Sequence, residues 1–352
     1  MGRRGDIAGT VRSALAAAAT VLLCASSAAA LTININPGAT LAGNTAALDA
    51  FNRAADQWEA VFTDDVTVTI DADLLNLGAS NIIGQASSAQ LGAGYDGIRN
   101  QMVADAADES DNGIVAFLPT AAQFSAVVPV GFGLDGTLQA TKANLKAMGF
   151  AGLDGTFGVS DGTIEFNTQF AFDFDNSDGV GAGLTDFESV AAHEIGHTLG
   201  FVSVVDTIDF LVDQGSTANV FLNPLDLFRF GTASGNPGTT TEFTNFDRNL
   251  IPGQDAFFDD LLSEISLSEG VFNGDGRQAS HWKANELTGT LIGVMDPTLA
   301  AQEVLSISAD DIRAFDLIGW DVAEAETVSV PAPGSLLIFG VGLLLLRRRI
   351  AV

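Results

Sequence analysis

Apolar residues recur three or four positions apart early in the chain, at Leu48, Phe51, Ala55, Trp58 and Phe62. This spacing predicts an amphipathic helix whose apolar face packs on a core. From Val66 to Asp71 apolar and polar residues alternate, which predicts a half-buried strand. A helix followed by a strand in this order indicates the start of an α/β layer.

The same patterns predict other short elements. Helices are expected at residues 95–107, 138–148 and 310–319, strands at 114–118, 126–130 and 163–167, and a strand or turn at 226–230. Gly149 is placed to end the second of these helices. Residues 204–279 show no sustained period and contain a Gly, Thr and Asn-rich stretch at 231–244, so this region is expected to be looser.

One apolar segment, from Val190 to Phe201, is expected to form a helix with a special role. Thr185 and Glu188 ahead of it have the T-x-x-E spacing of a capping box. Gly200 is placed to end the helix and turn the chain. Both ends of this helix are therefore marked in the sequence.

The same segment contains the motif H-E-x-x-H at His193, Glu194 and His197. On a helix the two histidines lie one turn apart, so both imidazoles leave the same face and can bind one Zn²⁺. Glu194 is offset from the pair and can act as a general base toward water. The motif also occurs in unrelated proteins, so ordinary core or surface histidines are the alternative.

The composition limits the partners that this chain can have. It has 352 residues, 47% of them hydrophobic, which is enough for one large domain or two unequal lobes. The net charge of −29 argues against nucleic acid or an anionic membrane surface as a partner. Simple solubility is the favoured explanation of this charge.

Residues 1–30 have the pattern of a secretory signal peptide. Arg3, Arg4 and Arg12 give a positive n-region, an apolar run follows, and residues 28–30 offer an A-x-A cleavage site. The single cysteine, Cys24, lies inside this segment. The mature chain is therefore expected to have no disulfide and no cysteine-bound metal.

Residues 323–352 are expected to form an acidic linker and a sorting or anchor segment. A proline motif at 330–334 precedes an apolar run at 335–346 and three arginines at 347–349. This order resembles the PEP-CTERM sorting signal of Gram-negative bacteria, with Ala332 where that motif has Glu. The resemblance implies an exosortase-type sorting enzyme as partner, transient membrane contact, and delivery to the cell surface, outer membrane or extracellular matrix. The alternative is a tail anchor with permanent membrane contact.

A third ligand is needed to complete a zinc site with an open position. Metzincin metalloproteases place a third histidine three positions after the glycine of H-E-x-x-H-x-x-G, where this chain has Ser203. His281 is the only histidine that remains, and Met295 follows it in G-V-M-D-P, which looks like a metzincin Met-turn. The order of these segments, with S-H-W-K around His281, resembles the leishmanolysin family of metzincins.

The leishmanolysin resemblance implies that His193, His197 and His281 hold one Zn²⁺ per chain. In the same way, Glu194 would be the general base and Met295 an apolar floor under the metal. The implied reaction is hydrolysis of a peptide bond in a protein or peptide substrate.

The resemblance also implies the fold class, which is α+β with a metzincin-like (zincin) catalytic domain of two lobes. The N-terminal lobe, residues 31–203, would hold a mixed sheet and the active-site helix. The C-terminal lobe, residues 204–322, would be looser and would carry the third histidine and the Met-turn.

A candidate substrate strand lies at Thr163, Ile164, Glu165 and Phe166. It precedes the active-site helix, and an edge strand can bind an extended peptide by β-augmentation. Its position and the family resemblance together suggest that this strand is that edge.

An acidic loop contains Asp173, Asp175, Asn176 and Asp178. Its oxygen atoms could bind Ca²⁺, but Asp178 stands where the glycine of an EF-hand loop should be. A turn with Asx hydrogen bonds is the favoured interpretation.

The sequence as a whole predicts a secreted zinc endopeptidase. One alternative is a structural protein of the cell surface or biofilm matrix, built on a metzincin scaffold with little catalysis. Another is a zinc hydrolase for an ester or amide outside proteins. Glu194 favours an enzyme, because a scaffold would need the histidines at most.

Overall fold

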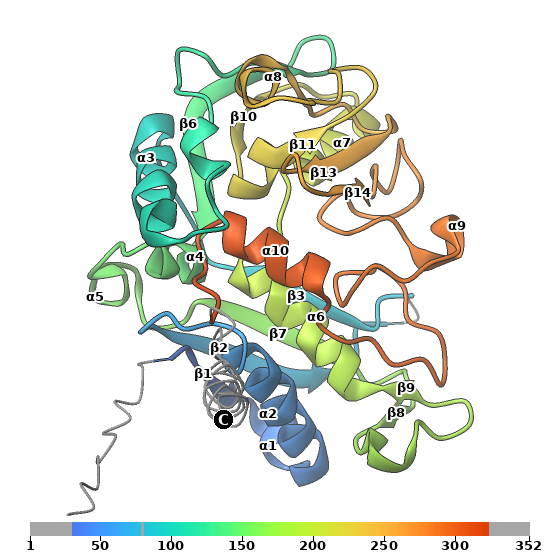
Figure 1. Ribbon diagram of the computed structural model, residues 1–352. Coiled ribbons are helices and arrows are strands. Elements are labelled where there is room, and N and C mark those ends of the chain that lie inside the picture. Colours follow the sequence, from blue (N-terminus) through green and yellow to red (C-terminus); the bar gives the residue numbers. More distant parts are fainter. Residues whose placement is uncertain (1–29, 79–80, 324–352) are drawn as a thin grey trace, which may run out of the picture.

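The computed structural model describes residues 30–78 and 81–323 (Figure 1). The predicted signal peptide up to residue 29 and the sorting segment from residue 324 lie outside this range. Among the described residues, no helix has the length and apolar character needed to cross a membrane.

The largest sheet has the strand order β1-β2-β7-β3. Strands β1 (Thr32–Pro37), β2 (Thr67–Leu75) and β7 (Gly162–Asn167) are parallel, whereas β3 (Gly84–Ser88) runs antiparallel to β7. The sheet is therefore mixed, and the predicted α+β class is confirmed.

Two helices cover one face of this sheet. Phe166 of β7 contacts Phe51 of α2 (Thr45–Glu59) at 5.2 Å between ring centroids, and Phe187 of α6 (Phe187–Leu199) at 4.4 Å. The helices also contact each other, because the Trp58 Nε1–H donates to the Ala192 carbonyl at 2.9 Å. This packing fixes α6 against the sheet (Figure 1).

Two further sheets each combine strands that come before residue 203 in the sequence with strands that come after it. One has the order β10-β6-β4, and in the other β12 pairs with β5. The bounds are β4 (Gln90–Gly94), β5 (Ala126–Val127), β6 (Gly133–Thr141), β10 (Asn219–Leu222) and β12 (Arg248–Asn249). Residues before and after the predicted lobe boundary are thus joined by strand pairing.

The remaining elements are short. Those before α6 are α1 (Ala39–Ala42), α3 (Tyr95–Asp105), η1 (Ala106–Asp108), η2 (Val115–Phe117), α4 (Lys142–Ala147), α5 (Leu153–Phe157), β8 (Phe172–Asp173), η3 (Asn176–Asp178) and β9 (Thr185–Asp186). Those after it are α7 (Val205–Asp213), η4 (Pro224–Phe228), β11 (Arg229–Phe230), α8 (Thr240–Asn245), β13 (Ala256–Asp259), β14 (Glu264–Leu267), α9 (Asn285–Thr288) and α10 (Ala309–Leu317).

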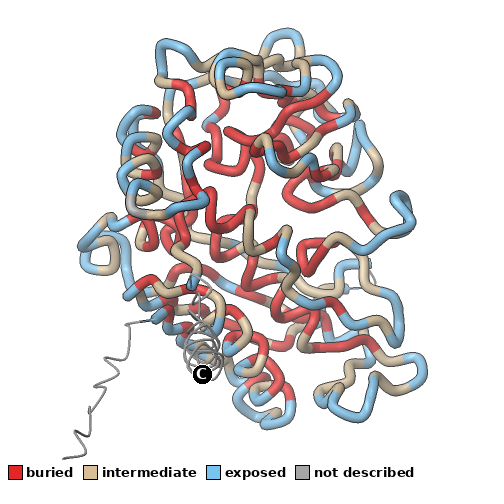
Figure 2. Tube along the Cα trace, in the orientation of Figure 1, coloured by how far each residue is buried: buried red, intermediate tan, exposed pale blue. Residues whose placement is uncertain are grey.

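The region expected to be looser is packed around aromatic side chains that belong to the common hydrophobic core. Phe228, Phe258 and Trp282 are fully buried, with ring centroids 5.3 Å apart between the first pair and 5.9 Å between the second. Figure 2 shows buried segments in this region as well as along α6. Short elements packed around aromatic rings therefore replace the expected loose chain.

Three predicted elements are wrong in type. Residues 115–117 form a 3₁₀ turn rather than a strand, because a short apolar run does not distinguish the two. Residues 138–141 belong to β6, and the helix begins only after Thr141, whose hydroxyl accepts the Asn144 N–H at 3.2 Å as an N-cap. Within 231–244, the end forms α8, which Thr239 caps.

Candidate metal centre

The start of α6 differs from the predicted capping box. Asp186 is the N-cap, and its carboxylate accepts the Ser189 N–H at 3.0 Å. Thr185 lies in β9, and Glu188 binds Arg53 instead, at 2.8 Å between Oε2 and Nε. An Asp one position later provides the stronger cap, which frees Glu188 to hold α6 against α2.

The end of α6 agrees with the prediction and also orients a ligand. Gly200 adopts a φ of +131°, which favours glycine, and the chain turns there. The turn places the Phe201 carbonyl 2.8 Å from Nδ1 of His197. Termination of the helix therefore fixes one imidazole.

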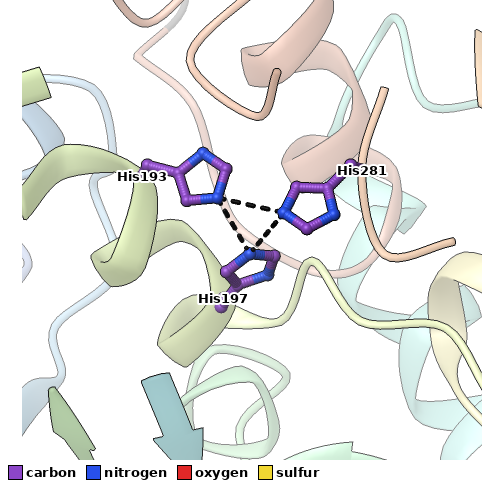
Figure 3. Close-up of side chains that lie close together, drawn as sticks. All are labelled: His193, His197 and His281. Carbon is purple, nitrogen blue, oxygen red and sulfur yellow. Dashed lines mark hydrogen bonds between the residues drawn. The ribbon is translucent and has the colours of Figure 1, made fainter. Parts of the chain in front are cut away.

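The three histidines of the chain converge on one point, as Figure 3 shows. Nε2 of His193 lies 3.0 Å from Nε2 of His281 and 3.1 Å from Nε2 of His197. The third side of the triangle, between His197 and His281, is also 3.1 Å. These three side chains lie close enough to bind one metal ion.

Hydrogen bonds at the Nδ1 atoms determine which tautomer each imidazole ring adopts. Nδ1 of His193, His197 and His281 lies 2.8, 2.8 and 3.0 Å from the carbonyl oxygens of Val294, Phe201 and Gln278. A carbonyl only accepts, so each Nδ1 carries the proton and each neutral ring presents a lone pair at Nε2. Three lone pairs that face one another are the donor set of a cation site.

Burial keeps these imidazoles neutral. It lowers the pKa of His193 to about 4 and that of His197 to about 3, and it lowers the pKa of His281 well below its ordinary value. Neutral imidazole is the form that binds a metal. The ligands are thus ready at neutral pH without first losing a proton.

The Glu194 side chain extends from α6 to the edge strand β3. A Cβ atom added to Gly84 of β3 would lie 2.9 Å from its Oε1 atom and 2.9 Å from Cγ1 of Val190. Burial raises the pKa of the Glu194 carboxyl to about 8. The carboxyl group is therefore close to its titration range at neutral pH, as proton transfer requires.

Met295 packs directly against helix α6. A Cβ atom at Gly196 would lie 2.4 Å from its Sδ atom, so the glycine inside H-E-x-x-H is what allows this approach. Met295 is fully buried, and the neighbouring Val294 carbonyl receives the His193 bond. The turn at 293–297 thus supports the helix and one ligand together.

Ser203, which stands where a metzincin has its third histidine, has a different task. Its hydroxyl donates to Asp226 at 2.6 Å, and its N–H donates to the Ser280 hydroxyl at 2.8 Å. It therefore joins the end of α6 to the segment that delivers His281.

The predicted substrate edge is wrong. Thr163, Ile164, Glu165 and Phe166 belong to β7, which pairs with β2 on one side and β3 on the other. Both sets of its backbone groups are used, so β7 cannot add a peptide strand. The sequence pattern identified a strand correctly but contains no information on the order of strands in the sheet.

Strand β3 is the edge of this sheet next to α6. Its backbone N–H and C=O groups point alternately toward β7 and away from it. The Asn167 N–H donates to the Ile83 carbonyl at 2.9 Å, and the Ala89 N–H to the Asp161 carbonyl at 2.8 Å. Antiparallel pairing alternates, so Gly84, Ala86 and Ser88 turn their N–H and C=O groups away from β7. In the described part of the chain no strand pairs with this side of β3.

The acidic loop forms the Asx turns that were expected. Asp173 accepts the backbone N–H groups of Asp175 at 3.1 Å and Gly181 at 2.8 Å, one with each oxygen. Asp175 in turn accepts the Ser177 N–H at 3.2 Å. These carboxylates bind and order the backbone of the loop.

Asp206 and Asp311 were not singled out from the sequence. Both carboxylates accept hydrogen bonds around His281 and the Met295 turn. Asp311 had a local signal, the S-x-x-D capping box with Ser308. Nothing near Asp206 in the sequence indicated its partners, which lie more than 70 positions away.

Comparison with protein-family models, with curated proteins and with solved structures finds no significant match. No family membership or activity therefore passes to this chain from a relative.

Proposed function

We propose that this chain is a zinc-dependent endopeptidase. The observation that carries the proposal is the triangle of three Nε2 lone pairs with a buried carboxyl, Glu194, on the same helix. Three neutral imidazoles with a fourth position open are typical of catalytic zinc. Tetrahedral zinc with bonds of about 2.0–2.1 Å needs nitrogens about 3.3 Å apart, close to the 3.0–3.1 Å spacing here.

The chemistry divides between the metal and the chain. Zinc bound here would supply a Lewis acid that polarises a carbonyl oxygen and lowers the pKa of water. A nearby cation would favour the ionised form of Glu194, which accepts the proton of the attacking water. Glu194 would then deliver that proton to the leaving amine.

We further propose that β3 binds the substrate. Its free N–H and C=O groups, at Gly84, Ala86 and Ser88, would pair with an extended peptide by β-augmentation. The Ser88 hydroxyl lies 3.3 Å from the His197 carbonyl, and Gly84 lies beside Glu194, so this strand runs along the metal-binding helix. A backbone-reading edge favours a peptide over a small ester or amide.

We also propose that the protein is a metzincin of leishmanolysin-like type and that it is exported. The packing of Met295 under Gly196 and the role of His281 support the first. The signal-like residues 1–30 and the PEP-CTERM-like residues 323–352 support export, with an exosortase-type enzyme as partner and the surface or matrix of a Gram-negative cell as destination.

Metal analysis and variants at the three histidines test the metal centre. Zinc content should be near one per chain, and His281→Ala should lower it as strongly as His193→Ala. An unchanged content in His281→Ala would contradict the three-ligand site.

Cleavage of a denatured protein tests the endopeptidase. Glu194→Gln should retain zinc and lose cleavage by a factor of about 10² or more. Glu188→Gln, on the same helix but bound to Arg53, is the matched control and should retain cleavage. A zinc-bound wild type that cleaves no protein would favour the scaffold, or the non-peptide hydrolase if an ester is cleaved.

A further inference from the structure

The segment Ala279–Trp282 brings His281 to α6 from a distant part of the sequence, and two carboxylates bind residues on either side of His281 in the sequence: half-buried Asp206 and buried Asp311. We propose that Asp206 and Asp311 are positioning residues that hold this segment and thereby set the metal affinity of the three-histidine site. The inference rests on the metal centre proposed above and is independent of which bond the protein hydrolyses.

Asp206 binds the residues just before His281. Its Oδ1 accepts the Ala279 N–H at 2.5 Å, and its Oδ2 accepts the Ser280 N–H at 3.2 Å and the Ser280 hydroxyl. The Ser280 oxygen also accepts the Ser203 N–H at 2.8 Å, just after the end of α6. Asp206 therefore links the end of the metal-binding helix to the segment with the third ligand.

A buried cation offsets the charge of this network. The Arg229 guanidinium donates to the Ala279 carbonyl at 3.3 Å and to the Ser268 carbonyl at 2.7 Å. Burial raises the pKa of Asp206 to about 6 and also raises that of Asp226, and the Arg229 charge opposes both shifts. The backbone of Ala279 is thus held at its N–H by Asp206 and at its C=O by Arg229.

Asp311 binds the residues just after His281 and the Met295 turn. Its Oδ1 accepts the Trp282 indole N–H at 2.7 Å and the Met295 N–H at 3.3 Å. Its Oδ2 accepts the Val294 N–H at 2.7 Å. Because the Val294 carbonyl receives the Nδ1–H of His193, Asp311 supports two ligands, whereas Asp206 supports one.

These contacts lie outside the metal-binding nitrogens but restrict where His281 can lie. Loss of a partner that orients a ligand typically lowers metal affinity by about 10–100-fold. Each oxygen of Asp206 accepts a backbone N–H, so an amide at this position would place an N–H₂ group against one of these N–H groups. Asp206→Asn should therefore raise the zinc dissociation constant by about 10–100-fold.

The test is zinc competition against a chelator of known affinity, with full-length folded protein. Asp209→Asn is the matched control, since Asp209 lies on the same helix α7 and binds the Phe272 and Asn273 N–H groups, away from His281. Its affinity should stay within about twofold of wild type, as for changes without a shared partner. A dissociation constant of Asp206→Asn equal to that of the control would overturn the proposal.

A double-variant cycle separates positioning from general destabilisation. Once His281→Ala has removed the third ligand, Asp206→Asn should cause no further loss of zinc affinity. Asp311→Asn should still cause a loss in that background, because it also acts through Val294 on His193. An equal loss from Asp206→Asn with and without His281 would contradict the proposed role.

A milder variant covers the case in which Asp206→Asn does not fold. Ser280→Ala removes only the hydroxyl that joins Ser203 to Asp206, and it should weaken zinc binding by a smaller factor. Unchanged affinity would overturn the link through Ser280. Failure of the wild type to bind zinc would overturn the metal centre, whereas zinc binding without peptide cleavage would overturn only the endopeptidase.

Discussion

Two glycines set the geometry around the Glu194 carboxyl and around helix α6. Gly84 lets β3 approach Glu194, and Gly196 lets Met295 approach α6 from below. In each case a single Cβ atom would enter space that a functional side chain occupies. Effects of substitution at these positions should therefore separate catalysis from metal binding.

Gly84→Ala should reduce kcat/KM by about tenfold or more, which corresponds to about 1.4 kcal/mol. The new Cβ would lie 2.9 Å from both Glu194 Oε1 and Val190 Cγ1, so the carboxylate must move. Zinc content should be unchanged, as measured by metal analysis. Gly113→Ala, where a Cβ meets nothing within 4 Å, is the control; equal activity of the two variants would contradict the expectation.

Gly196→Ala should destabilise the protein by roughly 1–3 kcal/mol, as overpacking does. Its Cβ would lie 2.4 Å from the Met295 Sδ atom, which is fully buried. Denaturant unfolding of this variant, of Met295→Ala and of the double variant forms a test. The double variant should lose less stability than the sum of the two; simple additivity would indicate that the clash is absent.

At the scale of elements, the site depends on pieces that are brought together from separate parts of the chain. Helix α6 supplies His193, His197 and Glu194, while α7 and α10 hold the segment that carries His281. Strand β3 adds an edge along the same helix. The function proposed for this edge can be tested at one backbone group.

Ala86→Pro removes the N–H that points away from β7, so it should lower kcat/KM for a protein substrate by about tenfold. It should leave most of the stability intact, because no ladder hydrogen bond to β7 is removed. Ala86→Ser keeps the N–H and is the control. Ser87→Pro, whose N–H faces β7, should destabilise instead. Full activity in Ala86→Pro would exclude peptide pairing at this position.

At the scale of the whole molecule, some of the acidic residues behind the −29 net charge interact closely with one another. A cluster of carboxyl groups lies where the chain returns from α10 toward the end of α2, at Asp64, Asp105, Glu109, Asp316 and Asp321. Burial, together with Asp321 and Asp64, raises the pKa of Asp105 to about 8, and burial and Asp321 raise that of Asp64 to about 7. Near neutral pH, Asp105 and Asp64 therefore hold protons in the folded chain that they release in the unfolded chain.

The sign of the resulting pH dependence follows from these raised pKa values. Stability from this cluster is present at acid pH and is lost as the pH rises from about 4 to about 8. Asp105→Asn should therefore raise Tm relative to wild type at pH 9 and raise it much less at pH 5. About 1 kcal/mol corresponds to roughly 2 °C in a chain of this size. Asp65→Asn, at an exposed position, is the control, and an equal Tm gain at both pH values would contradict the prediction.

Removal of metal should also lower the stability of the folded chain, by an amount that depends on the zinc concentration. A ligand that binds only the folded chain adds about 2.7 kcal/mol at a concentration 100 times its dissociation constant. Tm should thus fall on chelation and recover with added zinc. His281→Ala should show a smaller response to zinc than the wild type, and a Tm independent of zinc in the wild type would argue against the site.

The sequence by itself determined the features that depend only on local helix and strand geometry. The spacing of His193 and His197 places both on one face of α6, and Gly200 ends the helix, because both depend only on helix geometry. His281 could be predicted as a ligand because the chain has only three histidines. The helix at 45–59 and the strands at 67–75 and 162–167 were predicted in type for the same reason.

Only the tertiary structure decided which strand is the edge and which carboxylates hold His281 in place. Strand order places β7 inside the sheet and β3 at its rim, although β7 has the clearer alternation in sequence. Asp206 binds Ala279, far away along the chain. Asp311 binds the turn at 293–297, which has no periodic pattern of apolar and polar residues. Such contacts are set by the packing of whole elements, which no local spacing of apolar and polar residues encodes.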